Sequence, residues 1–273
     1  MKRSVALAVS IALFAASVAD AQIPALNGGK TIDFVYDASD VRHPEEAYEG
    51  RLFVPREVAA DPRVPRPFLV FLHGVNPEHI RLRFSGGKPD EPDVRILVAQ
   101  MIANGTIPPV VLGAPGTTVS SELPVTLWPG FDLDRFVERS ARLLRGKATL
   151  DLDRVVLVGH SGAGCNAKGG LFSALAGTTL HLRAIMSADT CMDVDQAKLL
   201  AAAPAGTDVV VTWQPFTWKR DFDAYRAAMD AVPIPEGSRR FLEQMDPPRS
   251  MGDHHSAMVE ATLARFLRVV LER

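Results

Sequence analysis

The chain has 273 residues, of which 47% are hydrophobic and 23% charged, and its 30 basic and 32 acidic residues give a formal charge of −2. This composition is typical of a globular protein and excludes disordered, collagenous and polytopic membrane chains. The near balance of charge gives no reason to expect nucleic acid or an anionic membrane as a partner.

The N-terminal segment has the features of a secretory signal peptide. A basic start, Lys2 and Arg3, precedes an almost unbroken apolar run at residues 5–18, and Ala19-Asp20-Ala21 forms a small-x-small cleavage pattern. The run of about 14 residues is shorter than the roughly 20 that a spanning helix needs, so we expect no membrane span in the mature protein. We expect cleavage after Ala21, a periplasmic or secreted location, and a single domain over residues 22–273.

The rest of the chain alternates short apolar runs with amphipathic segments. Alternating runs at residues 31–36 and 48–54 are typical of antiparallel edge strands. Continuous apolar runs predict central strands buried on both faces, at residues 67–72, 109–112, 154–158, 182–186, 208–213 and 240–245. Apolar residues at three- and four-residue spacing predict helices at residues 93–104, 132–144, 162–176, 222–231 and 256–271, with part of a helix near 196–203. The alternation predicts an α/β fold, with a mostly parallel sheet covered by helices on both faces.

Ser161 lies where a predicted strand turns into a predicted helix. Residues 154–158 are an apolar run rich in β-branched residues, and Gly159-His160-Ser161-Gly162-Ala163 follows at once. Small residues around a serine allow a sharp turn that holds its hydroxyl in a strained position above the strand ends. A helix beginning here would place backbone N–H groups and a positive dipole end beside that hydroxyl. The segment therefore favours a nucleophile elbow.

Two further motifs accompany this elbow: His73-Gly74 ends an earlier apolar run, and His254-His255 precedes the last predicted helix. With these three motifs the chain resembles the α/β-hydrolase superfamily of serine hydrolases, from about residue 31 to its end. The resemblance implies the α/β-hydrolase fold and acyl-transfer chemistry, with no cofactor and no metal. Ala163 departs from the family pattern, because the elbow more often has glycine there. The short stretch between residues 189 and 208 leaves no room for a large cap domain.

The resemblance implies that Ser161 is the nucleophile and that a histidine ahead of the last helix is its general base. His255 is favoured, because His255-Ser256-Ala257-Met258-Val259 fits a pattern found in several esterase branches. His254, its neighbour in the chain, is the alternative base.

The acid of the triad stays open at this point. Asp189 closely follows the apolar run at residues 182–186, and a branch of the family places its acid there. The usual place is after the next strand, where Asp221 and Asp223 are the first acids beyond the run at 208–213. Asp189 is favoured because it ends a strand at the expected rim of the site. Asp223 also has a structural explanation, as an acid in the first turn of a helix.

The family pattern also implies an oxyanion hole, formed by the backbone N–H groups of Gly162 and Val75. An oxidising compartment would allow the two cysteines of the chain, Cys165 and Cys191, to form a disulfide. They follow strands that the fold makes neighbours, so a bridge would tie the elbow helix to the loop of Asp189.

The expected activity is hydrolysis of a carboxylic ester, amide or thioester in a small-molecule or polymeric acyl substrate. Residues 75–92, 117–131 with Trp128, and 216–218 are expected to line an open pocket. Five basic residues lie in or beside these loops, either as ordinary surface charges or as contacts for an anionic or extended substrate: Arg81, Arg83, Lys88, Lys219 and Arg220.

Three alternatives to this activity remain. The first is a peptidase or amidase that acts on a peptide or polymer with the same triad. The second is a metal-dependent phosphoesterase, because Asp253-His254-His255 superficially resembles a motif of such enzymes. The third is a binding protein that keeps the fold without its chemistry.

Overall fold

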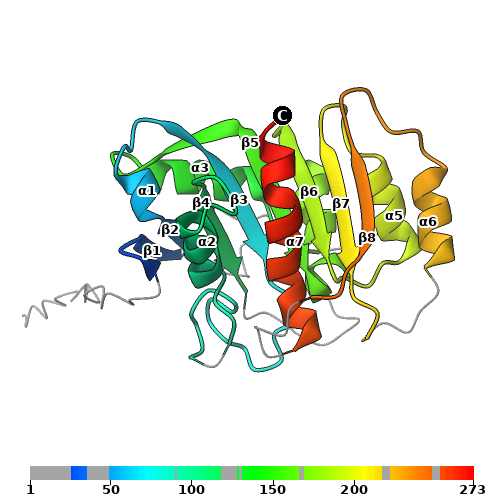
Figure 1. Cartoon of the computed structure of the whole chain (residues 1–273), viewed down its shortest axis with the longest axis horizontal. Helices are drawn as coiled ribbons and strands as arrows, with labels where there is room; N and C mark the ends of the chain where they lie inside the picture. Colours follow the sequence, from blue (N-terminus) through cyan, green and yellow to red (C-terminus); the bar gives the residue numbers. More distant parts are fainter. Residues whose placement is uncertain are drawn as a thin grey trace, which may run out of the picture.

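The computed structural model describes residues 26–35, 49–89, 91–117, 128, 131–165, 169–216, 222–247 and 253–273. The predicted signal peptide lies outside these residues. An eight-stranded sheet with the order β1-β2-β4-β3-β5-β6-β7-β8 forms the centre of the molecule (Figure 1). Its strands are β1 (Lys30–Val35), β2 (Glu49–Val54), β3 (Pro65–Leu72), β4 (Val111–Gly116), β5 (Thr149–His160), β6 (Leu182–Ala188), β7 (Asp208–Trp213) and β8 (Arg240–Gln244).

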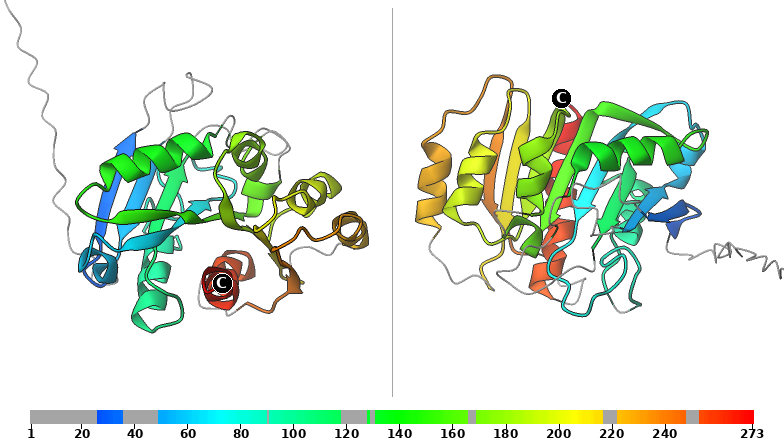
Figure 2. Two further views of the ribbon diagram at one scale, coloured as in Figure 1. Left: turned by 90° about the horizontal axis from the view of Figure 1, so that it is seen from above. Right: turned by 180° about the vertical axis from the view of Figure 1, so that it is seen from behind.

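As the sequence predicts, the first two strands are antiparallel at one edge of the sheet, while β3 to β8 run parallel to one another. Helices α2 (Val94–Ala103) and α7 (His254–Leu271) cover one face (Figure 2). The other face carries α3 (Leu133–Leu143), α4 (Leu171–Gly177), α5 (Val194–Ala201) and α6 (Asp223–Asp230), and a short helix α1 (Arg56–Ala59) follows β2.

Alternate residues of the central strands point into two separate cores. In β3, Phe68 and Val70 pack with the residues of α3 to α6, whereas Leu69 and Phe71 pack with those of α2 and α7. A strand buried on both faces must be apolar at every position, which explains the continuous run that the sequence displays. The predicted α/β architecture is therefore confirmed.

The pairing register brings the carboxyl ends of four parallel strands level with one another. Leu72 of β3 pairs with Gly159 of β5, His160 of β5 with Ala188 of β6, and Ala188 with Thr212 of β7. Residues that follow these strands consequently lie along one edge of the sheet, as is common for ligand sites in parallel sheets.

The helix predicted at residues 162–176 is confirmed only from Leu171 onward. A single 3-10 turn, Ser161–Gly164, follows β5, and α4 starts only at Leu171. Gly170 has a φ of 57°, and a Cβ there would lie 2.0 Å from the Ala163 carbonyl oxygen. The chain crosses itself closely at this glycine, which apolar periodicity alone does not reveal.

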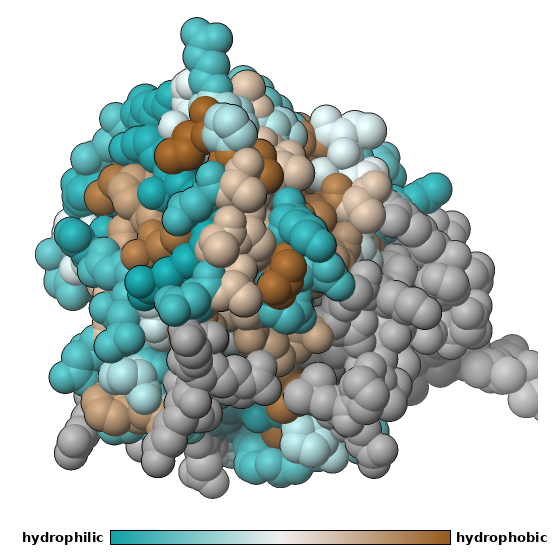
Figure 3. All heavy atoms as spheres, turned by 90° about the vertical axis from the view of Figure 1, so that its right-hand side faces the viewer, coloured by the Kyte–Doolittle hydropathy of each residue, from teal (hydrophilic) through white to brown (hydrophobic). Residues whose placement is uncertain are grey.

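Two strand predictions also need correction. The strand expected at residues 109–112 is β4, and it continues through Gly113. The residue there is glycine because the rings of Phe68 and Phe136 fill the space where a Cβ would lie. The run at 240–245 is an edge strand, β8, and it is only half-buried. On this side of the molecule hydrophobic side chains lie in small groups among hydrophilic ones (Figure 3). The polar side chains of Arg240, Glu243 and Gln244 suit an exposed edge.

Within the described ranges, no helix has both the length and the apolar character needed to cross a membrane.

Asp208, the first residue of β7, is expected to contribute to the stability of the sheet. Its buried carboxylate accepts hydrogen bonds from Arg239 Nη2 at 2.6 Å and from Arg273 Nη1 at 3.2 Å. We expect Asp208→Asn to lower the free energy of unfolding by about 2 kcal/mol, because two guanidinium groups lose the charge that they share. The midpoint of urea denaturation measures this change.

Asp195→Asn is the matched control, because Asp195 forms an exposed pair with Lys198 at 3.7 Å. We expect this variant to change the free energy of unfolding by less than about 0.5 kcal/mol. Equal effects of the two substitutions would contradict the role given to Asp208.

Candidate active site

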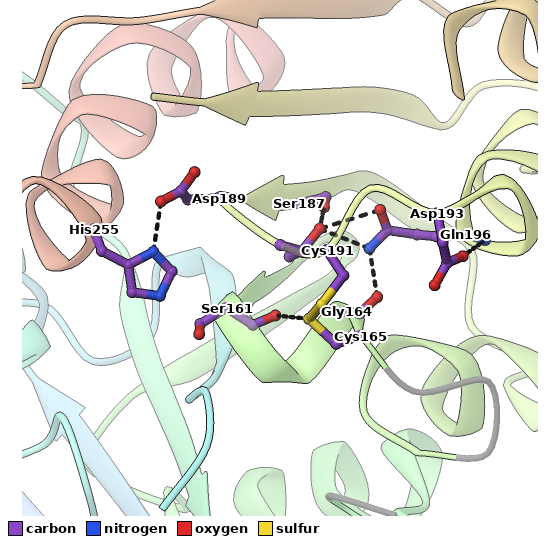
Figure 4. The surroundings of a disulfide bond; sticks show 10 residues. Ser161, Gly164, Cys165, Ser187, Asp189, Cys191, Asp193, Gln196 and His255 are labelled. Carbon is purple, nitrogen blue, oxygen red and sulfur yellow. Dashed lines mark hydrogen bonds and ion pairs between the residues drawn. A yellow bond between two sulfur atoms is a disulfide. The ribbon is translucent and has the colours of Figure 1, made fainter. Parts of the chain in front are cut away.

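Polar residues converge at the level edge of the sheet, directly after four strands. His73-Gly74-Val75 follows β3, Ser161 follows β5, Asp189 follows β6 and Gln214 follows β7. Figure 4 draws the centre of this group, with the side chains of Ser161, Asp189 and His255 gathered between the strand ends and α7.

Ser161 occupies a strained turn that fits a nucleophile elbow. Its φ is 54°, a left-handed conformation that few residues other than glycine adopt without support from their surroundings. Gly74 lies directly against it: a Cβ on Gly74 would stand 2.5 Å from Ser161 Cβ, 2.8 Å from Ser161 Oγ and 3.2 Å from Gly162 N. Only a glycine leaves room for the serine hydroxyl here. The N–H groups of Val75 and Gly162 therefore belong to segments that meet at this hydroxyl.

His255 and Asp189 are in direct contact. His255 Nδ1 lies 2.5 Å from Asp189 Oδ2, and Asp189 is fully buried. Because a carboxylate oxygen accepts hydrogen bonds, Nδ1 of His255 is the donor in this contact. The His255 ring lies between the Asp189 carboxylate and the side chain of Ser161 (Figure 4).

Asp189 is held by the neighbouring strand end. Its Oδ1 accepts from the Gln214 backbone N–H at 3.2 Å, and its Oδ2 accepts from Gln214 Nε2 at 3.0 Å. Its own N–H donates to the Thr212 carbonyl at 2.8 Å, and its φ is 49°. Sequence reasoning missed Gln214, although a polar residue directly after a buried strand was a usable signal.

The histidine pair lies inside α7 rather than before it. The helix begins at His254, because Asp253 caps it by accepting from the Ser256 N–H at 2.6 Å. His160 Nε2 lies 3.1 Å from the His255 carbonyl oxygen, and the two rings are 4.6 Å apart. Burial, with a smaller contribution from His255, holds the pKa of His160 well below its ordinary value. The neutral His160 ring therefore donates to the backbone of His255.

The alternative candidates lie elsewhere. The His254 ring stacks on Phe216 with 4.3 Å between centroids, and Asp223 is an exposed first residue of α6. Asp221 lies outside the described residues. The side chains of Asp253, His254 and His255 each contact a different partner, which does not suit the phosphoesterase alternative. In the part of the chain that the structure describes, no group of three or more His, Cys, Asp or Glu side chains is arranged to hold a metal ion.

His73 lies beneath the Gly74 turn. Its Nδ1 donates to the Gly74 carbonyl at 2.7 Å, while its Nε2 accepts from the Thr117 N–H at 3.3 Å. Burial lowers the pKa of His73 to about 4, so the ring is neutral at pH 7. Trp128, expected in the pocket wall, is instead fully buried, with Nε1 donating to the His73 carbonyl at 3.0 Å.

A disulfide joins the segments after Ser161 and Asp189. Cys165 and Cys191 are bonded, with their Cα atoms 4.9 Å apart (Figure 4). Beside the bridge, Gln196 Nε2 donates to the Gly164 carbonyl at 2.8 Å and to Thr190 Oγ1 at 2.8 Å. The elbow turn and the Asp189 loop are thus connected by one covalent bond and by the side chain of Gln196.

Comparisons with known proteins support the fold. No protein-family model matches the chain, and no curated protein matches its sequence. A mutant of the feruloyl esterase module from Clostridium thermocellum, complexed with sinapinate, is 13% identical, with a TM-score of 0.56 over 88% of this chain and 87% of that one. An S-formylglutathione hydrolase from Agrobacterium tumefaciens is 15% identical, with a TM-score of 0.53 over 90% of this chain and 96% of that one.

A third structure of the same fold, an enterobactin hydrolase in complex with DFP, is 15% identical, with a TM-score of 0.53 over 90% of this chain and 96% of that one. Sheet order and these likenesses confirm the expected α/β-hydrolase fold.

The disulfide generates a stability prediction. We expect the double variant Cys165→Ala/Cys191→Ala to lose about 3 kcal/mol of unfolding free energy, because the bridge restricts the unfolded chain across a 26-residue separation. Chemical denaturation without reductant measures the loss. The same double variant in the presence of reductant is the control, and it should match reduced wild type. Equal stability of the variant and the oxidised wild type would contradict the prediction.

The buried histidines generate a pH prediction. The unfolded chain protonates His73 near pH 6.5, whereas the folded chain does so only near pH 4. Since the unfolded state binds more protons in that window, stability should fall as the pH drops from 6.5 to 4. We expect His73→Asn to reduce the slope of unfolding free energy against pH in this window. The reduction should approach about 1.4 kcal/mol per pH unit, the value for one bound proton. Identical slopes in the variant and in wild type would contradict the lowered pKa of His73.

Proposed function

We propose that this protein is a serine hydrolase that cleaves carboxylic esters through an acyl-enzyme on Ser161. The observation that carries the proposal is the 2.5 Å contact between His255 Nδ1 and the buried Asp189 carboxylate, beside a serine in a strained turn directly after β5. A buried carboxylate, a histidine and a serine in this order form the arrangement that activates a hydroxyl for acyl transfer.

The geometry suits each step of that reaction. Ser161 Oγ attacks the ester carbonyl while His255 Nε2 takes its proton, and Asp189 holds the tautomer and stabilises the imidazolium. The carbonyl oxygen becomes negative and accepts hydrogen bonds from the N–H groups of Val75 and Gly162. His255 then gives the proton to the leaving alcohol, and water repeats the sequence to release the acid.

An ester is the substrate class to assay first. The feruloyl esterase module among the structures of this fold supports that choice. The sequence alternative, a peptidase or amidase, uses the same triad. An ester and an amide of the same acyl group separate the two, because only the leaving group then differs.

We also propose that the mature protein is a single exported domain over residues 22–273. The basic and apolar N-terminal segment and the Ala19-Asp20-Ala21 cleavage pattern support export. The disulfide between Cys165 and Cys191 suits an oxidising compartment such as the periplasm or the medium.

Paired substitutions test the triad. We expect Ser161→Ala, His255→Gln and Asp189→Asn each to lower kcat/KM for p-nitrophenyl acetate by about 10,000-fold, because each removes one member of a cooperating unit. The neighbouring substitutions His254→Gln and Asp223→Asn should change kcat/KM by less than about tenfold. Steady-state kinetics on the purified mature protein provide the measurement.

Several outcomes would contradict the assignment. Full activity in Ser161→Ala would show that Ser161 is not the nucleophile. A larger loss of activity in His254→Gln than in His255→Gln would show that His254 is the general base. A larger loss of activity in Asp223→Asn than in Asp189→Asn would show that the acid of the triad is the one that follows β7.

A further inference from the structure

Arg83 differs from the neighbouring Arg81 because it is partly buried in an ion pair with Glu91. Its Nε lies 2.7 Å from Glu91 Oε1, and the two side chains are only 18% and 8% exposed. The second oxygen of Glu91 accepts from the Phe84 N–H at 2.8 Å. Arg81, two residues earlier, is 73% exposed in its pair with Glu49. Of the two alternatives that the sequence leaves open for Arg83, an ordinary surface charge does not fit this partly buried ion pair.

The guanidinium of Arg83 also binds the backbone beside Ser161. Its Nη1 donates to the carbonyl of Val75. On the other side of the same residue, His73 Nδ1 donates to the carbonyl of Gly74 at 2.7 Å. The Gly74 carbonyl belongs to the peptide unit that carries the Val75 N–H. The two peptide planes that flank Val75 are thus held by a buried histidine and by a partly buried arginine.

The loop after Val75 requires such support. His79, Leu82 and Phe84 have φ values of 52°, 55° and 57°, which are costly without glycine. Arg83 stands between two of them, with its guanidinium 5.3 Å from the Phe84 ring. A loop with this much strain keeps its shape only when surrounding contacts define it.

We propose that Arg83 is a positioning residue of the oxyanion hole, which fixes the direction of the Val75 N–H by holding the Val75 carbonyl while Glu91 holds Arg83. This inference rests on the proposed ester hydrolysis. The Val75 donor matters most when the substrate carbonyl oxygen becomes negative, so its alignment affects the transition state more than substrate binding. Arg83 therefore acts on kcat rather than on KM.

The charge of Arg83 has a second consequence for the same residues. It contributes to the lowered pKa values of His73 and His160, although burial is the larger cause for both. A neutral His73 keeps its Nε2 free to accept from the Thr117 N–H while its Nδ1 holds Gly74. Arg83 and His73 support one turn from two sides.

Three arginine variants test the proposal. We expect Arg83→Met to lower kcat for p-nitrophenyl acetate by about 100-fold, the loss typical of one oxyanion donor, with KM changed by less than about threefold. Arg83→Lys should recover part of the loss, because a lysine ammonium still donates to one carbonyl. Arg81→Met, the matched control, should keep wild-type kcat and KM.

Inhibitor binding separates positioning from general structural support. A trifluoromethyl ketone adds to the serine hydroxyl and places a negative oxygen in the oxyanion hole, whereas p-nitrophenol, the leaving group, brings no acyl oxygen to that hole. We expect Arg83→Met to weaken binding of the ketone by about the same factor as kcat and to leave inhibition by p-nitrophenol unchanged. Unchanged kcat, or a rise in KM alone, in a folded Arg83→Met protein would overturn the proposal.

If Arg83→Met does not fold, Glu91→Ala tests the positioning role of Arg83 instead. It frees Arg83 from its partner and should lower kcat and ketone affinity together, while wild-type values of both would overturn the proposal. Wild type and Ser161→Ala are assayed first on the same ester. An inactive wild type, or an active Ser161→Ala, contradicts the proposed function, whereas a normal Arg83→Met with both references as expected contradicts only the positioning role.

Discussion

The Asp189 carboxylate is a charge with no exposure to solvent, and a buried charge is costly unless it is paired and hydrogen-bonded. Gln214 supplies two donors and His255 a third, so the ends of β6 and β7 and the start of α7 meet at one side chain. This requirement fixes the position of α7, since Asp253 begins the helix at the turn that brings His255 to Asp189. The imidazole ring lies between the Asp189 carboxylate and the side chain of Ser161 (Figure 4).

The space around Ser161 follows from small residues and strained turns. Parallel strands in register place Gly74, Ser161 and Asp189 at one edge, and both polar residues adopt left-handed backbone conformations. Such strain persists only where neighbours define the conformation. The disulfide stabilises the segments that follow Ser161 and Asp189. The hydrogen bonds of His73 and Arg83 on either side of Val75 stabilise the neighbouring turn.

Local patterns predicted the sheet and the turn at Ser161 directly after β5, because a strand buried on both faces must be apolar throughout. They failed where distant contacts decide: Gly170 interrupts the helix expected at 162–176, and Gly113 accommodates aromatic rings instead of ending β4. The histidine pair was visible in the sequence, but the acid stayed open because strand ends do not reveal which carboxylate is buried. Gln214 and Arg83 act through contacts with residues that the fold brings close. The spacing of residues along the sequence does not predict such contacts.

The central claim is that Ser161 is an activated nucleophile. Labelling of the native mature protein with a fluorophosphonate probe, followed by peptide mapping, tests it most directly, because an unactivated serine does not react. We predict one adduct, on the peptide that contains Ser161, and its absence in Ser161→Ala. No adduct, or an adduct on another residue that persists in Ser161→Ala, would contradict the account.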